Sequence, residues 1–287
     1  MEPYGRFVSD TARRAFLAAY DRALLAWPEP RTSWDLETRF GSVHVHRYGP
    51  ADGTPIVLLH GAAGNATNWY PHVAALGVHH QVFALDTLDE PNRSVARQAL
   101  TGPDQTASWL DETLGLLGLD AVHLVGFSYG GYLALNQAVH GPDRLRRVTV
   151  IDPGGLATVP ARFYLSMLAG AFAMILPRRW HPWLSRALAQ RALLEPPDQL
   201  ALIKAAATSF RTRRPAARRL TDDELRSIRV PVRVLLAGRS VLLDPQRTLA
   251  RVHALIPDVR AAIVPGAGHG LPLEQPGLVT ARILADD

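Results

Sequence analysis

One stretch decides the fold, and it reads Val122-His123-Leu124-Val125-Gly126-Phe127-Ser128-Tyr129-Gly130-Gly131. Its first half is apolar and predicts a short buried strand, whereas its second half is the motif Gly-x-Ser-x-Gly-Gly. Residues 132–139, which follow directly, have the composition of a helix. The stretch therefore predicts a strand, a sharp turn and a helix, with Ser128 at the turn.

The glycines on either side of Ser128 indicate how a serine can occupy such a turn. The serine must adopt a strained backbone conformation, and side chains two positions before and after it would collide with the turn. Gly126 and Gly130 leave that space empty. The hydroxyl of Ser128 then stands free above the sheet, and the helix behind it directs its first amide groups toward the reacting oxygen. In this context the motif predicts a nucleophilic serine.

Composition and charge limit the classes of protein to consider. The chain has 287 residues, 47% hydrophobic and 20% charged, which suits a globular α/β protein with a substantial core. It has no cysteine, and this excludes disulfides, thiolate metal ligands and a cysteine nucleophile. The net charge of +5 comes almost entirely from arginine. The densest cluster comprises Arg211, Arg213, Arg214, Arg218 and Arg219.

This arginine cluster lacks interleaved aromatic residues and matches no nucleic-acid-binding module, so we expect no nucleic-acid partner. No apolar run approaches the length of about 18 residues that spans a bilayer. The first residues also lack a charged-then-apolar signal pattern. We therefore expect a cytoplasmic protein whose partner is a small-molecule substrate. The sequence assigns no oligomeric state.

Apolar runs and helical segments alternate along most of the chain. Besides the central strand, buried strands are predicted at 55–60, 81–86, 147–152, 232–237 and 260–264. The alternation is interrupted once, by several helices punctuated with prolines. We predict an α/β fold with a mostly parallel sheet flanked by helices. Its core comprises residues 1–155 and 228–287, and a helical cap, residues 156–227, is inserted before the last two strands.

The predicted cap contains many large apolar side chains. An insertion at this point lies over the carboxyl ends of the strands, where open α/β sheets bind ligands. We expect the cap to act as a lid and to form one wall of a pocket for a largely hydrophobic group. The side chains expected to bind the substrate are Phe163, Met167, Phe172 and Trp180.

Taken together, these features resemble the α/β-hydrolase superfamily, and most of all its bacterial carboxylesterase-like members. The resemblance covers almost the whole chain: His60-Gly61 after an early strand, the Ser128 motif, the helical cap, and Gly266-Ala267-Gly268-His269 after the last strand. It implies an α/β-hydrolase fold and a serine hydrolase that uses no cofactor and no metal.

The chemistry of such an enzyme requires a base and an oxyanion hole. A serine hydroxyl becomes a good nucleophile when a base accepts its proton, and His269 is expected to be that base. It follows the last strand on a loop of small residues, and the order serine before histidine matches the family. The oxyanion hole is expected to consist of the backbone amides of Ala62 and Tyr129.

The acid that orients His269 has two candidates, and the third alternative is that His269 has no functional acid. In most relatives it lies in the loop after the strand at 232–237, but here the first positions of that loop hold Arg239 and Ser240. Asp244 is the only acid in this loop, and we expect it to complete the triad. Asp152, at the exit of the preceding strand, is the alternative. Each has a simpler explanation, because Asp244 suits a helix cap and Asp152 suits a turn.

Three functions follow, in order of preference. The first is hydrolysis of a carboxylic ester, thioester or lactone of a largely hydrophobic small molecule through an acyl-enzyme. The second is a non-hydrolytic cyclase or lyase of natural-product biosynthesis on the same scaffold. The absence of an acid at Ser240 and the unusual Asp89-Glu90 pair motivate it. The third is a binding protein that has lost turnover.

Overall fold

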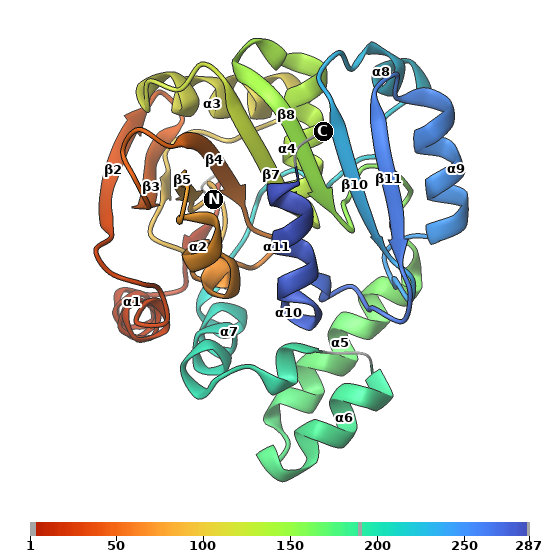
Figure 1. Cartoon of the computed structure of the whole chain (residues 1–287). Helices are drawn as coiled ribbons and strands as arrows, with labels where there is room; N and C mark the ends of the chain where they lie inside the picture. The colour runs from red at the N-terminus through yellow and green to blue at the C-terminus, as the bar shows by residue number, and fades with distance from the viewer. Residues whose placement is uncertain (1–3, 189–190, 286–287) are drawn as a thin grey trace.

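The computed structural model describes residues 4–188 and 191–285, and its centre is a nine-stranded sheet. Eight strands follow the order β11-β10-β8-β7-β4-β5-β3-β2, and β6 pairs with β3 (Figure 1). Neighbours from β11 to β5 are parallel, whereas β3 runs antiparallel to β5, β2 and β6. This confirms the predicted α/β fold with a mostly parallel sheet. The bounds are β2 (Thr32–Thr38), β3 (Gly41–Tyr48), β4 (Thr54–Leu59), β5 (His80–Leu85), β6 (Val95–Ala96), β7 (Val122–Phe127), β8 (Leu145–Ile151), β10 (Val232–Ala237) and β11 (Val259–Val264).

Helices cover both faces of this sheet. One face carries α3 (Pro103–Leu116), α4 (Tyr129–His140) and α9 (Pro245–Leu255). The other carries α1 (Asp10–Leu24), α2 (Tyr70–Leu76) and α11 (Pro276–Leu284), with the short α10 (Leu271–Glu274) just before α11. Parallel strands that are covered on both faces must be apolar on both faces, which explains the continuous apolar runs in the sequence.

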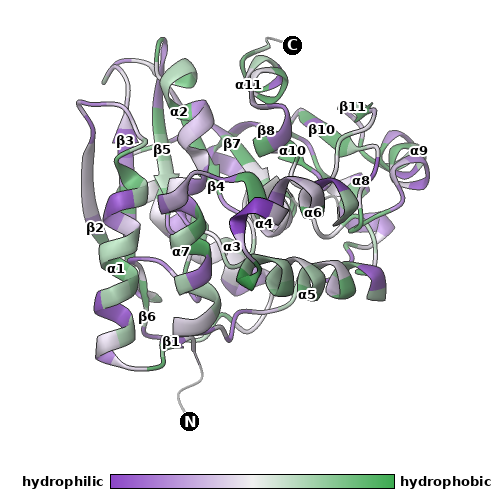
Figure 2. Ribbon diagram, turned by 90° about the horizontal axis from the view of Figure 1, so that it is seen from below, coloured by the Kyte–Doolittle hydropathy of each residue, from purple (hydrophilic) through white to green (hydrophobic). Residues whose placement is uncertain are grey.

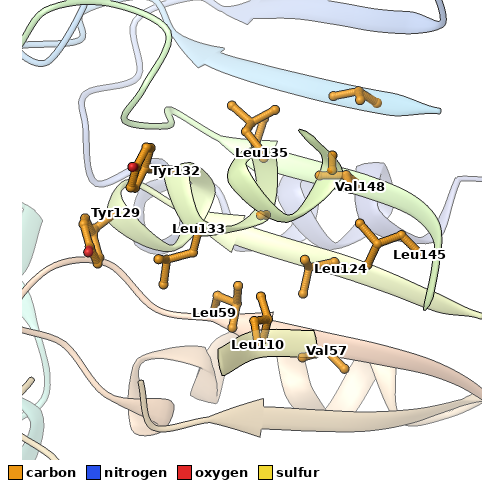
Figure 3. Packing of buried hydrophobic residues seen from close by; sticks show 14 of the residues in the cluster. Val57, Leu59, Leu110, Leu124, Tyr129, Tyr132, Leu133, Leu135, Leu145 and Val148 are labelled. Atoms are coloured by element: carbon orange, nitrogen blue, oxygen red, sulfur yellow. The ribbon is translucent and has the colours of Figure 1, made fainter. Parts of the chain in front are cut away.

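Strand β4 shows how the two layers share one strand. Val57 and Leu59 pack in the core cluster on the α3–α4 side, whereas Ile56 and Leu58 pack in the cluster on the opposite side. Side chains alternate across a strand, so successive residues enter different layers. Figure 3 shows Val57 and Leu59 beside Leu110 of α3. The same packing holds β7 rigidly at the centre of the sheet.

The helical insertion follows β8 and ends before β10. It contains α5 (Ala161–Ile175), α6 (His181–Leu188), α7 (Pro197–Ser209), β9 (Phe210–Arg211) and α8 (Asp222–Ser227). Figure 1 shows α5, α6 and α7 grouped together below the sheet. Helix α8 lies apart from them, because it packs against α4 and α9 and buries Leu225 in the core. Figure 2 shows α5 coloured largely as hydrophobic.

The insertion is also attached to the beginning of the chain. Strand β1 (Arg6–Phe7) pairs antiparallel with β9, and α1 packs along α7. No pattern in the sequence predicts this short two-stranded sheet. Two-residue strands have no recognisable period, so only the tertiary structure reveals the pairing. Over the described ranges, no helix has the length and apolar character that crossing a bilayer requires.

Candidate active site

Ser128 lies at the turn between β7 and α4 in a strained conformation. Its φ is +52° and its ψ is −111°, a backbone conformation that residues with a Cβ atom rarely adopt. A Cβ atom at Gly126 would lie 2.2 Å from the carbonyl oxygen of Gly130, and one at Gly130 would lie 2.2 Å from that of Leu59. The turn therefore requires glycine at both positions, and the predicted strand, turn and helix are present.

His269 lies on the loop after β11 and reaches Ser128. Its Nε2 atom is 3.0 Å from the Ser128 hydroxyl oxygen, and its Nδ1 atom is 2.6 Å from a carboxylate oxygen of Asp152. Its ring is packed between Phe127 and Phe163, with centroid distances of 5.2 and 5.5 Å. A proton on Nδ1 that is donated to Asp152 leaves Nε2 free to accept the serine proton. The three side chains thus form a continuous hydrogen-bonded chain.

Asp152 is fully buried at the exit of β8. One carboxylate oxygen accepts hydrogen bonds from His269 and from the Ser240 hydroxyl at 2.7 Å. The other carboxylate oxygen accepts a hydrogen bond from the backbone amide of Ala237 at 3.1 Å. These donors fix the direction in which the carboxylate points.

The structure therefore corrects the expected partner of His269. Asp244, which we favoured from the sequence, caps α9 and accepts the backbone amide of Arg247 at 3.1 Å. Asp152, the alternative, contacts His269. The physical reason is that β8 and β10 are neighbouring parallel strands, so acids after either strand emerge at the same edge. Ser240 occupies the loop position where relatives often carry the acid, and here it donates to Asp152.

The loop after β4 faces Ser128 and carries Ala62. Buried His60 fixes this loop: its Nδ1 donates to the carbonyl oxygen of Gly61 at 2.8 Å, while its Nε2 accepts the amide of Thr87 at 3.1 Å. Burial lowers the pKa of His60, which keeps its ring neutral as these two bonds require. Tyr129 begins α4, and amides in the first turn of a helix have no intrahelical acceptor.

A cavity of about 480 Å³ joins the Ser128–His269 pair to the insertion. Ala62 lies at its wall, and α5 contributes Phe163 and Met167 as expected. The other two expected residues, Phe172 and Trp180, are instead 63% and 47% exposed on the outer surface. Further residues that were not predicted also line the cavity, and they include Gly170, Ala171, Met174, Leu202 and Ile203.

The helical period explains which residues of α5 line the cavity. Phe163, Met167, Gly170 and Met174 recur at intervals of three or four and so share one face. Phe172 lies on a different face of the same helix. Because α5 is apolar all around, hydrophobicity alone could not separate the two faces, whereas the period from Phe163 could. No group of three side chains suited to hold a metal ion occurs among the residues described.

Comparison with known proteins identifies the family. Residues 56–283 match the model of the alpha/beta hydrolase family. The chain belongs to this family. It is 32% identical over 281 residues to carboxylesterase YbfK of Bacillus subtilis, covering 94% of this chain and 92% of that one. It is 29% identical to the carboxylesterase nap of the same organism, covering 96% and 93%.

Solved structures agree with this assignment. The naproxen esterase of Bacillus subtilis superimposes with a TM-score of 0.85 at 29% identity, covering 96% of this chain and 98% of that one. The carboxylesterase CesB (YbfK) of the same organism gives a TM-score of 0.84 at 28% identity. The chain is therefore a carboxylesterase-like α/β-hydrolase enzyme with the α/β-hydrolase fold.

The turn around Ser128 generates a stability prediction. Gly126→Ala places a methyl group against backbone atoms that cannot move aside, so we expect the free energy of unfolding to fall by at least about 2 kcal/mol. Gly277→Ala in α11 is the matched control. Its added Cβ meets nothing within 4 Å, and alanine favours a helix, so we expect stability to stay equal or rise. Urea denaturation measures both, and an unchanged midpoint for Gly126→Ala would contradict the described turn.

Proposed function

We propose that the protein is a serine esterase that cleaves a carboxylic ester of a largely hydrophobic small molecule through an acyl-enzyme. The observation that carries this proposal is the hydrogen-bonded chain from Asp152 through His269 to Ser128, at 2.6 and 3.0 Å, beside an apolar cavity. A thioester or lactone would react by the same steps. The carboxylesterase names of the two Bacillus subtilis relatives support this class of reaction.

Acylation begins at Ser128. Its hydroxyl oxygen attacks the ester carbonyl carbon while Nε2 of His269 accepts the hydroxyl proton. The carbonyl oxygen becomes negatively charged in the tetrahedral intermediate, and the backbone amides of Ala62 and Tyr129 stabilise it. His269 then gives its proton to the leaving alcohol as the carbon–oxygen bond breaks. The acyl group remains on Ser128.

Deacylation repeats these steps with water as the nucleophile. His269 accepts a proton from water while the water oxygen attacks the acyl carbon. The bond between that carbon and the Ser128 oxygen then breaks, the proton returns to the serine oxygen, and the carboxylic acid leaves. Asp152 holds the Nδ1 proton of His269 and stabilises the imidazolium that forms in both halves of the cycle. Ser240 and the Ala237 amide keep Asp152 oriented toward the ring.

The insertion supports a preference for apolar substrates. We propose that residues 156–227 form a cap on a core of residues 1–155 and 228–287, and that α5 and α7 act as the lid of the pocket. Phe163 and Met167 of α5 and Leu202 of α7 face the cavity, and its volume suits a small molecule. The absence of an acid at Ser240 is one of two reasons for the cyclase or lyase alternative, and the contact between Asp152 and His269 speaks against that reason.

Hydrolysis of a series of p-nitrophenyl acyl esters tests the proposed reaction. We expect wild-type turnover, with a chain-length profile set by the apolar cavity. Ser128→Ala removes the nucleophile and should lower kcat by about 10⁴-fold or more. Circular dichroism should show that the variant is folded. Turnover that survives in Ser128→Ala, or no wild-type turnover of any ester, would contradict the proposal.

The identity of the acid is tested by two matched substitutions. Asp152→Asn keeps the shape of the side chain but no longer favours the Nδ1 proton of His269, so we expect kcat to fall by about 10³- to 10⁴-fold. Asp244→Asn should leave turnover near the wild-type value, because asparagine caps a helix as well as aspartate does. Steady-state kinetics with one p-nitrophenyl ester measures both variants. The reverse pattern, with Asp244→Asn inactive, would refute the assignment.

A further inference from the structure

An ion pair between a buried carboxylate and a partly buried guanidinium lies beside the loop that carries Ala62. Glu90, in the loop after β5, is 1% exposed, and one of its carboxylate oxygens forms an ion pair with the guanidinium of Arg214. Arg214 belongs to the segment between β9 and α8, so the pair connects the insertion to the core. The mechanism proposed above assigns no role to either residue.

Glu90 fixes the first proposed oxyanion donor. Its second carboxylate oxygen accepts the backbone amide of Ala63 at 3.0 Å. Ala63 has a φ of +56°, a strained value that persists only where the surroundings hold it. Because Ala62 directly precedes Ala63, the direction of the Ala62 amide depends on this anchored peptide.

Arg214 fixes the second proposed donor. Its guanidinium carbon lies 3.9 Å from the centre of the Tyr129 ring, which places a cation on the face of the ring. The carbonyl oxygen of the next residue, Pro215, accepts the Tyr129 hydroxyl at 2.9 Å. Residues 214 and 215 thus hold the side chain of Tyr129, and the backbone amide of Tyr129 is the second proposed oxyanion donor.

The same segment is attached to the Glu90 loop at a further point. The hydroxyl of Thr212 donates to the carbonyl oxygen of Asp89 at 2.7 Å. Asp89 also accepts the amide of Gly5. Residues 212–215 of the insertion therefore contact both the loop after β5, which holds the Ala63 peptide, and the side chain of Tyr129.

The energetics argue against a purely structural reason for this pair. Burial raises the pKa of Glu90 to about 7, although Arg214 opposes the shift, so burial of the carboxylate outweighs the attraction of its partner. Apolar side chains of similar volume often replace a buried ion pair without loss of stability. This pair costs desolvation, and it contacts the peptide next to Ala62 and the side chain of Tyr129. It is better explained by the positions that it fixes.

We propose that Glu90 and Arg214 are positioning residues that hold the amides of Ala62 and Tyr129 in register with the substrate carbonyl oxygen. This role rests on the proposed esterase mechanism. Neither side chain takes part in bond making. Glu90 acts through the Ala63 peptide, and Arg214 acts through the Tyr129 ring. Their ion pair couples the two, so they work as a unit.

The proposal predicts a specific kinetic pattern. Oxyanion contacts strengthen as the tetrahedral intermediate forms, so their loss lowers kcat and leaves KM nearly unchanged. In Glu90→Gln and in Arg214→Met we expect kcat to fall about 10- to 100-fold. This fall is at most close to the decrease in kcat that removal of a whole oxyanion donor causes. The double variant Glu90→Gln/Arg214→Met should be no slower than the slower single variant, because either change already uncouples the pair.

The experiment measures kcat and KM for p-nitrophenyl butyrate, together with inhibition by butylboronic acid, which forms a tetrahedral adduct with an active serine. The inhibition constant of the boronic acid should rise in parallel with the fall in kcat. Arg214→Lys retains the positive charge but loses the planar contact with Tyr129, so we expect an intermediate loss. Thermal melting shows that each variant is folded at the assay temperature.

Glu224→Gln is the matched control. It breaks the Arg218–Glu224 ion pair in the same part of the chain, with the same chemical change, and we expect kcat and boronic acid affinity to stay at the wild-type values. An equal loss of kcat in this control, normal kcat in the Glu90 and Arg214 variants, or a raised KM with normal kcat would each overturn the positioning role. Failure of the esterase mechanism itself appears separately, as wild-type inactivity or as turnover that survives Ser128→Ala.

Discussion

The hydrogen bond between His269 and buried Asp152 sets the geometry on which the rest of the site depends. Asp152 directly follows β8, Ser128 directly follows β7, and His269 lies on the loop after β11. Parallel strands bring all three to one edge of the sheet. The rigid core around β4 and β7 then fixes Ser128 relative to the other two. The 3.0 Å contact between His269 and Ser128 is a consequence of strand order rather than of local flexibility.

The strain in the structure is concentrated around this edge. Ser128, Asp152, Ala63 and Asp89 all have positive φ without being glycine, and all four lie in loops at the carboxyl ends of strands. Such conformations persist only when neighbouring contacts hold them, and they cluster at functional sites. Glu90 and Arg214 add a buried charge pair to the same region. The core away from this edge consists mainly of apolar side chains and provides the stability that the strained loops lack.

Local sequence patterns predicted the parts of the site that depend on local geometry. Ser128 was recognisable because Gly126 and Gly130 mark a turn that few other residues could form. His269 was recognisable from its small-residue loop after the last strand. The acid that partners His269 was not recognisable from the sequence. The loops after β8 and β10 lie side by side, and spacing along the chain does not reveal which loop faces the histidine. The capping role of Asp244 and the donor role of Ser240 appear only in three dimensions.

The same limit explains the other differences. Phe172 and Trp180 belong to apolar stretches, and hydrophobicity alone could not say which face of α5 turns inward or that Trp180 lies on the outer surface. Arg214 looked like one member of a basic cluster, yet the fold pairs it with Glu90, which lies 124 residues earlier in the chain. Contacts between residues so far apart depend on topology rather than on any local period.

The most direct test of the account is to trap the covalent intermediate. Wild-type protein mixed with p-nitrophenyl butyrate is quenched in acid within the first turnover, digested and examined by mass spectrometry. The account predicts that the peptide containing Ser128 gains the mass of one butyryl group and that this gain disappears after longer incubation without substrate. An unmodified Ser128 peptide during active turnover, or the acyl group on another residue, would contradict the proposed mechanism.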